Sequence, residues 1–182
     1  SKEEVEKRVG PITIGENRDG ELYQEPLCLY FSSLEESPEA IIERDGISMD
    51  SIKVNPNKHW GINSIQLSES ILHADRTGFT THVDGENFVT KKIFVCETLL
   101  GLSAKYDEYC PTLKRPPEIG SINYLPYHYN SIRGTDHELG VEVHSVFDPG
   151  QVFLRYLIEY TVPIKDPNPA EPIKDPNPAD SK

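Results

Sequence analysis

The chain has 182 residues, of which 36% are hydrophobic and 26% are charged, and this size suits one domain with a substantial core. Its formal net charge of −12 repels phosphate backbones and anionic lipids, which argues against nucleic-acid and membrane-surface binding through bulk charge. The three cysteines lack the spacing of a zinc site, and no apolar run reaches the about 20 residues of a membrane span. We therefore expect an intracellular location, in the cytoplasm or nucleus, and no metal site.

The first half of the chain alternates short predicted elements with polar loops. Residues 1–10 begin with SKEE and end at the pair Gly10-Pro11, which favours a short capped helix. Residues 26–31 (PLCLYF) predict a buried strand. Residues 37–44 (SPEAIIER) combine a serine cap, proline at the first helical position and an acid in the first turn, and Gly46 follows their end. These signals together predict a short helix.

The middle of the chain predicts two more strands and a long irregular region. A strand is expected around residues 62–67, followed by a short helix from Ser68 or Ser70 toward Asp75. Residues 92–101 (KIFVCETLLG) form the most apolar predicted strand. Residues 103–137 carry four prolines, so mostly loop is expected there.

The last folded segment is predicted to be a β-hairpin. Residues 141–147 alternate with a period of two, a turn follows at residues 148–150 (DPG), and a second β-rich run extends to Tyr160. Short strands, few helices and long loops together favour an α+β fold on a β core.

The C-terminal 20 residues contain a repeat, PIKDPNPAE followed by PIKDPNPAD. Six of the chain's fifteen prolines lie there, and each removes a backbone donor and disfavours helix before it. We therefore divide the chain into a domain of residues 1–162 and a disordered proline-rich linker of residues 163–182 that leads to further sequence. A proline-rich ligand for a partner is the weaker alternative.

Five segments, taken in order, resemble the poly(ADP-ribose) polymerase type of ADP-ribosyltransferase domain. These segments are residues 29–47, 61–75, 93–101, 115–117 and 141–160. They follow the family's order: a strand, turn and helix come first, then core strands, then a proline-rich loop, and finally the last strands. Each segment alone is a weak signal, and their order carries the resemblance. The resemblance implies a split β-sheet core with short flanking helices and a cleft for NAD.

The resemblance also implies where a catalytic triad would lie. Phe31 stands in place of the family's His, with Tyr30 as the alternative occupant; Ile65 is the counterpart of its Tyr, and Val143 of its catalytic Glu. The same comparison assigns four residues next to the expected NAD cleft: Ser32, Ser33, Trp60 and Gly61. Trp60 is either a stacking platform for a ligand or a plug that fills an unused pocket.

The chemistry of the family explains why these departures matter. Cleavage of the bond between nicotinamide and ribose passes through an oxocarbenium-like centre, which a carboxylate and polar orienting groups stabilise. Val143, Ile65 and Phe31 offer neither. Glu142 is one residue away from Val143 but points to the opposite face of a regular strand, so it reaches the site only through a β-bulge.

Three readings of the function follow. The leading one is a catalytically degenerate domain that needs no cofactor and serves as a binding or scaffolding module for a protein partner. The rival is an active, NAD-dependent mono-ADP-ribosyltransferase that uses Tyr30, a serine of residues 32–33 and Glu142. The third is an unrelated α+β interaction subunit, since fold does not determine function.

Overall fold

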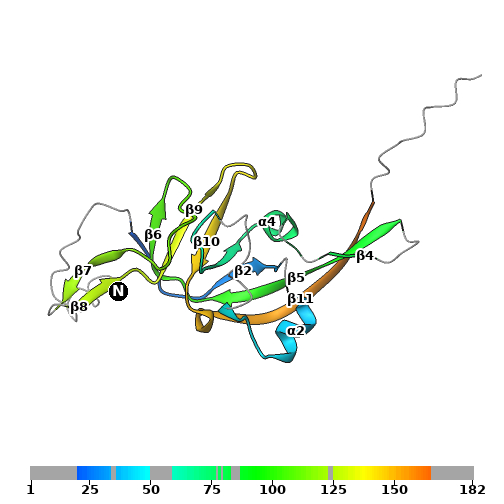
Figure 1. The fold of residues 1–182 in the computed structure, drawn as a ribbon, viewed down its shortest axis with the longest axis horizontal. Coiled ribbons are helices and arrows are strands. Elements are labelled where there is room, and N and C mark those ends of the chain that lie inside the picture. Colours follow the sequence, from blue (N-terminus) through cyan, green and yellow to red (C-terminus); the bar gives the residue numbers. More distant parts are fainter. Residues whose placement is uncertain are drawn as a thin grey trace, which may run out of the picture.

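The computed structural model describes residues 20–33, 36–49, 59–76, 78, 80–82, 87–122 and 125–164. These residues form a mixed α+β fold built on a nine-stranded sheet of order β1-β6-β9-β10-β3-β2-β5-β11, with β4 beside β5 and a separate β7–β8 ribbon (Figure 1). The strands are β1 (Gly20–Tyr23), β2 (Leu27–Phe31), β3 (Ile65–Ser68), β4 (Thr80–His82), β5 (Phe88–Thr98), β6 (Gly101–Tyr106), β7 (Glu118–Ile122), β8 (Leu125–His128), β9 (Ser131–Asp136), β10 (Val141–Val146) and β11 (Val152–Pro163). The helices are α2 (Pro38–Glu43), α4 (Ile71–Arg76) and the 3-10 turn η1 (Pro149–Gln151).

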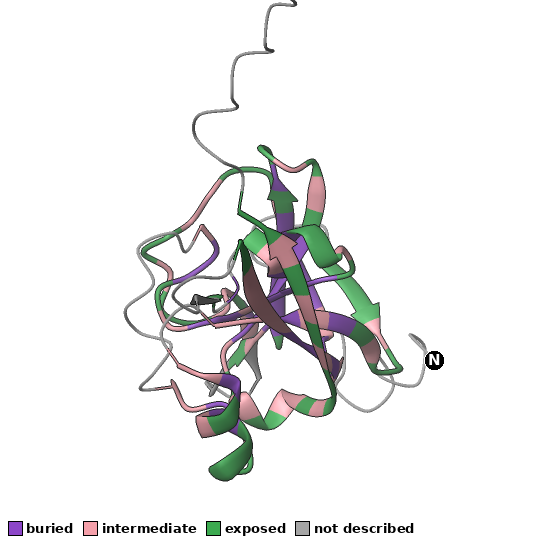
Figure 2. Ribbon diagram, turned by 90° about the vertical axis from the view of Figure 1, so that its right-hand side faces the viewer, coloured by how far each residue is buried: buried purple, intermediate pink, exposed green. Residues whose placement is uncertain are grey.

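The sheet buries apolar side chains on both of its faces. We call one face the α2 face; its core cluster consists of Leu29, Phe31, Ile41, Ile47, Ile65, Leu67, Phe94, Cys96, Leu100 and Val146. We call the other the Trp60 face; its cluster consists of Trp60, Ala104, Ile119, Tyr129, Ile132 and Val143. Because successive side chains of a strand point to opposite faces, β10 contributes to both clusters. Figure 2 shows the buried residues gathered inside the domain, with exposed ones along its outer elements.

The helix predicted at residues 37–44 is confirmed as α2. The Ser37 hydroxyl accepts the backbone N–H of Ala40 at 3.3 Å, and Pro38 occupies the first helical position. Ile41 is buried in the cluster of the α2 face. The helix ends where Asp45 adopts a φ of 61°, the left-handed conformation typical of helix ends. The helix predicted before Asp75 exists as α4, and the strand predicted at residues 26–31 exists as β2.

The predicted C-terminal hairpin is wrong in its pairing. β10 pairs with β9 and β3, whereas β11 pairs with β5, and three strands lie between β10 and β11 in the sheet. The turn itself was identified correctly, because the Asp148 carboxylate accepts the N–H of Gly150 at 2.8 Å and caps η1. The Leu99 N–H then donates to the Gln151 carbonyl at 2.8 Å, which brings the start of β11 to the end of β5. A period-two pattern identifies strands but not their partners.

The prediction of loop over residues 103–137 is also wrong, because most of β6 and all of β7, β8 and β9 lie there. Pro111, Pro116 and Pro117 fall between β6 and β7. Pro126 lies in the two-stranded β7–β8 ribbon, where each strand has one unpaired edge, and on that edge a missing backbone N–H breaks no strand pairing. β9 is short and carries few strongly β-forming residues, so its pattern is weak. Its place beside β10 and parallel to β6 depends on tertiary packing.

Several predicted boundaries shift or fall outside the described residues. The strand expected at residues 62–67 is β3 (Ile65–Ser68), and the strand expected at residues 92–101 begins earlier and ends at Thr98, as β5. β11 extends one residue past the predicted domain end at Val162, and the Ile164 N–H donates to Asn87 O at 2.9 Å. The predicted helix at residues 1–10 and the linker beyond Ile164 lie outside the described residues.

Gly134 in β9 gives a direct test of the packing on the Trp60 face. A Cβ at this position would lie 2.2 Å from Cη2 of Trp60, so any side chain must displace the indole. We expect Gly134→Ala to lower the free energy of unfolding by about 1–3 kcal/mol, the usual cost of overpacking a core. Urea unfolding of the purified chain measures it.

Gly150→Ala is the control for this prediction. Its Cβ would meet the exposed Asp148 side chain at 3.2 Å, which can move, so a change within about 0.5 kcal/mol is expected. Equal losses in the two variants would contradict the close contact between Trp60 and Gly134.

Candidate functional site

A row of residues crosses the Trp60 face where the resemblance to transferases places the catalytic centre. Tyr30 pairs with Ser68, Ser68 with Val143, and Val143 with Gly134, on the neighbouring strands β2, β3, β10 and β9. Cross-strand partners share a face, so these four residues line one side of the sheet. This row is the candidate site, and Trp60 covers its Gly134 end.

The structure does not bring Phe31, Ile65 and Val143 together. Phe31 and Ile65 are buried in the cluster of the α2 face, whereas Val143 belongs to the cluster of the Trp60 face. Strand alternation explains the separation, because the neighbours Tyr30 and Gln66 occupy the face that Val143 shares. The residues expected in the triad on β2 and β3, Phe31 and Ile65, therefore each stand one residue away from a position on the face of Val143.

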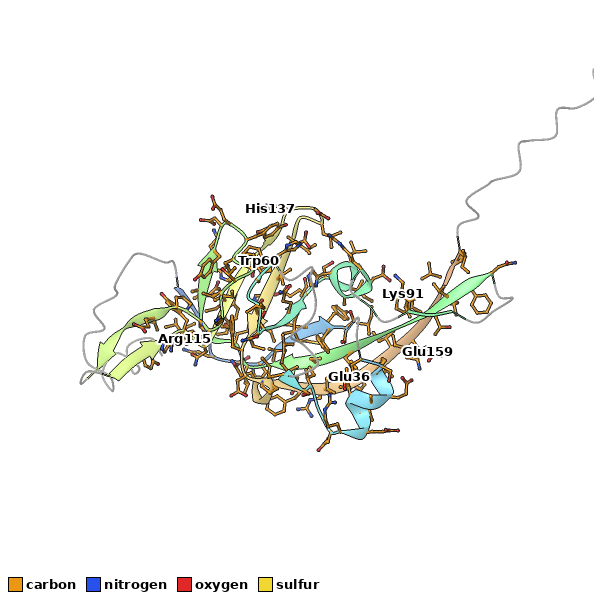
Figure 3. All side chains as sticks on the ribbon, viewed as in Figure 1. Glu36, Trp60, Lys91, Arg115, His137 and Glu159 are labelled. Atoms are coloured by element: carbon orange, nitrogen blue, oxygen red, sulfur yellow. The ribbon has the colours of Figure 1, made fainter. Side chains whose placement is uncertain are left out.

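Trp60 occupies the position of a plug in this structure rather than that of an exposed stacking platform. Its indole is only 1% exposed and lies on the bare backbone of Gly134, in the same cluster as Val143. Tyr109 contacts it edge-on, with ring centroids 5.1 Å apart. Figure 3 shows Trp60 on the side of the sheet away from Glu36 and α2. No ring face of Trp60 is left accessible for stacking on a ligand.

The loop that carries Trp60 is held by backbone and side-chain hydrogen bonds. The Cys110 N–H donates to His59 O at 2.8 Å, and the Gly61 N–H donates to Cys110 O at 3.1 Å. The buried Ser64 hydroxyl lies 2.7 Å from the Trp60 carbonyl and 2.9 Å from that of Gly61. Gly61 has a φ of 94°, and a Cβ there would lie 2.9 Å from the Phe147 ring. Hydrogen bonds at His59 and Gly61, the two neighbours of Trp60 in the chain, thus hold the indole in place.

The two serines predicted to contact a cofactor make hydrogen bonds within the domain. The Ser32 hydroxyl donates to the Ala74 carbonyl of α4 at 2.5 Å, and the Ser33 hydroxyl accepts the Glu36 N–H at 3.3 Å. Ser32 therefore ties the end of β2 to α4. Ser33 stabilises the turn that leads toward α2.

Polar atoms without a hydrogen-bond partner among the described residues lie beside Val143. Gln66 pairs with Ser145 across β3 and β10, and both residues share the face of Val143. The Gln66 Nε2 atom, the Ser145 hydroxyl and the Trp60 Nε1 atom are buried and have no partner within the described part of the chain. Buried polar groups of this kind are usually satisfied by an ordered water. The sequence missed both Gln66 and Ser145, and the register of β3 against β10 was the missing information.

Glu142, the carboxylate of the rival reading, points to the α2 face. β10 runs in regular register against both neighbours, so no bulge carries Glu142 over to Val143's side. Its carboxylate accepts a hydrogen bond from Arg133 at 3.1 Å and lies 3.4 Å from Nε2 of His144. Arg133 also pairs with Glu21 at 2.9 Å. Glu142 is therefore engaged in an ion-pair network on the face opposite Tyr30.

The network surrounds a fully buried histidine. His144 is 0% exposed, and neither ring nitrogen has a hydrogen-bond partner within the described residues. Burial lowers the pKa of His144, and the negative charges of Glu142 and Glu69 oppose this shift only in part. The Tyr23 ring contacts the imidazole edge-on at 5.8 Å, and burial raises the pKa of Tyr23 to about 12. The imidazole and the phenol are thus both neutral near pH 7.

His73 of α4 is a second buried histidine. It is 6% exposed, because α4 packs this side of the helix against the sheet. Burial lowers its pKa, while nearby Asp136 acts in the opposite direction. Asp75 of the same helix pairs with Lys91 at 2.9 Å. Across the described ranges, no three His, Cys, Asp or Glu side chains lie close enough to hold a metal ion.

Comparison with known proteins adds no family assignment. No protein-family model matches the chain, and no curated protein matches it in sequence. None of the helices within the described residues combines the length and apolar character that a membrane crossing requires.

The buried histidines predict a pH dependence of stability. A histidine whose pKa is lower in the folded state than its unfolded value of about 6.5 binds protons preferentially when unfolded. Stability is therefore complete above about pH 6.5 and falls as the pH drops below it, by at most about 1.4 kcal/mol per pH unit for each histidine. Urea unfolding at pH values from 5 to 7.5 should show this slope.

His144→Gln should make the slope shallower, because one of the buried titrating groups is removed. The exposed His137, replaced by Gln, is the matched control and should leave the slope unchanged. An unchanged slope in His144→Gln would contradict the burial of a neutral imidazole at this position.

Proposed function

We propose that this chain is a non-catalytic binding module with an ADP-ribosyltransferase-like fold. One observation carries the proposal: the Trp60 indole fills the space over Gly134 on the face of Val143, where the resemblance would place the catalytic carboxylate. An enzyme site has to leave an accessible cavity for its substrate. A fully buried indole beside a fully buried valine stabilises the domain in place of such a cavity.

The positions of the remaining polar groups support the same proposal. Tyr30 lies on the Trp60 face and Glu142 on the α2 face, so a triad of Tyr30, a serine and Glu142 would have to act through the sheet. Ser32 and Ser33 are engaged in hydrogen bonds with Ala74 and Glu36, as described above. An active transferase would need either a one-residue slip of β10 or a rearrangement of the Trp60 loop. A slip would turn every side chain of β10 to the other face.

The proposal predicts that the chain does not transfer ADP-ribose and that restoring one carboxylate does not create activity. Val143→Glu should lower the free energy of unfolding by about 1–3 kcal/mol, because the new carboxyl group is buried without a partner. It should not yield transfer, since Trp60 still covers the site. Thermal unfolding and incubation with radiolabelled NAD measure the two effects.

Val146→Glu is the matched control, since Val146 is equally buried in the same strand but on the α2 face. Both variants should lose stability, and neither should transfer ADP-ribose. Transfer by the wild-type chain that disappears in Glu142→Gln would establish the active-enzyme reading in place of the proposed one.

A further inference from the structure

β11 is the longest strand of the described structure and lies at the edge of the nine-stranded sheet. It pairs with β5 over its whole length of 12 residues, and no strand among the described residues pairs with its other side. The opposite edge of the sheet, β1, has only four residues. A long unpaired edge presents a row of backbone N–H and C=O groups to which another extended chain can bind.

A hollow follows this edge between β11 and the end of α2. It has a volume of about 480 Å³, and its wall includes six consecutive residues of β11, 152–157, together with Ile42, Asp45, Gly46 and Phe94. The register of β11 against β5 shifts between Leu154 and Tyr156, so the strand is irregular beside the hollow. From Tyr156 to Pro163 the pairing is regular again. The edge thus combines regular backbone with a cavity large enough for a side chain.

Apolar side chains are exposed around the hollow. Tyr156 is 71% exposed and Ile42 is 52% exposed, and Phe153 and Leu157 are also exposed. Ile42 of α2 and Leu157 of β11 lie on the same side of the sheet, because Leu157 pairs with Phe94 of the α2 face, and they form one apolar surface at the hollow. Phe153 and Tyr156 pair with Glu97 and Val95, so they flank the same edge from the other side of the sheet. Exposed apolar side chains beside an open edge are typical of a protein interaction site.

The charges beside this surface favour a basic occupant. The cations nearby are already held by carboxylates: Arg44 by Glu36, Arg155 by Glu97, and Lys92 by Glu39 and Glu159. Asp45 lines the hollow and makes no ion pair with any described residue. The chain as a whole carries a net charge of −12. A ligand with lysine or arginine would gain from both the local and the overall charge.

We propose that an extended segment of a partner protein binds along β11 as an added strand. Its backbone pairs with the free edge, one apolar side chain enters the hollow between α2 and β11, and a lysine or arginine lies beside Asp45. In such complexes the backbone hydrogen bonds provide affinity, and the pockets for alternate side chains provide specificity. This inference rests on the proposed role as a binding module and names the partner's chemistry.

Two other occupants fit the observations less well. A second copy of this chain would place two domains of net charge −12 against each other, with Asp45 and Glu159 of each near the contact. The chain's own residues 165–182 include a proline at every second to fourth position from 167 to 178, and proline lacks the N–H that strand pairing needs. Neither the second copy nor residues 165–182 supply both the backbone N–H donors for strand pairing and a positive charge for Asp45.

The test uses the full chain and synthetic eight-residue peptides in which lysine alternates with valine, with one central phenylalanine. Fluorescence anisotropy measures binding of the labelled peptide. A second peptide has glutamate in place of lysine, and a third carries N-methyl groups on alternate amides, which remove the donors of one edge. We expect the lysine peptide to bind, and the other two to bind at least about tenfold more weakly.

Variants of the chain locate the site. Ile42→Asp should weaken binding at least about tenfold, whereas Leu72→Asp, at an equally exposed leucine of α4, should leave it unchanged. Asp45→Asn keeps the side-chain shape, and asparagine tolerates the φ of 61°. This variant should bind the lysine peptide more weakly and the glutamate peptide no more weakly than the wild-type chain does. Hydrogen exchange should show new protection at amides of β11 and none at β1.

The outcomes separate this inference from the proposed function. Equal binding of the N-methylated peptide, equal effects of Ile42→Asp and Leu72→Asp, or no binding by any peptide would overturn the strand-addition site. Concentration-dependent dimerisation lost in Ile42→Asp would overturn it in favour of a second copy. None of these results changes the outcome with radiolabelled NAD, which tests the proposed function separately.

Discussion

The contact between the Trp60 indole and the bare backbone of Gly134 is the constraint on which the arrangement of the candidate site depends. A side chain at Gly134 would occupy the space of the indole, so the ring can lie flat against β9 only because that residue is glycine. The Trp60 loop is bonded on one side to Cys110 and on the other to Ser64, at the start of β3. One close contact thus joins the loop, β9 and β10, and it covers the end of the row that Val143 occupies.

A single sheet with two buried faces determines which residues can act together. Val143 and Glu142 are neighbours in β10, yet one lies under Trp60 and the other pairs with Arg133 on the opposite side. A catalytic group supplied by Glu142 therefore cannot meet Tyr30, however close the two are in the sheet order. The α2 face is open instead at its edge, where β11 and α2 leave apolar side chains exposed around a hollow. The hollow thus lies away from the face that a transferase would use.

Local chemistry predicted the elements well, and long-range pairing was beyond it. Ser37, Pro38 and the residues that end α2 interact with one another, so their pattern was sufficient to identify the helix. The partner of β11 depends on hydrogen bonds between Leu99 and Gln151, which are 52 residues apart, and no short pattern contains that information. The same limit applies to the candidate site: Val143 lies in the row and Trp60 covers its end, whereas Phe31 and Ile65 stood one residue from the positions on that face. The burial of His144 had a weak signal, since four of the six residues of β10 (VEVHSV) are apolar or small, as in a strand buried on both faces.

The most direct test of the account uses the chain's only tryptophan, which is Trp60 itself. Its fluorescence emission and its quenching by acrylamide report whether the indole is buried, and titration with NAD reports whether a ligand displaces it. If Trp60 closes this face, its emission is blue-shifted and weakly quenched, and it does not change when NAD is added at millimolar concentration. A red-shifted, readily quenched emission, or a change that saturates with NAD, would contradict the claim that Trp60 closes this face.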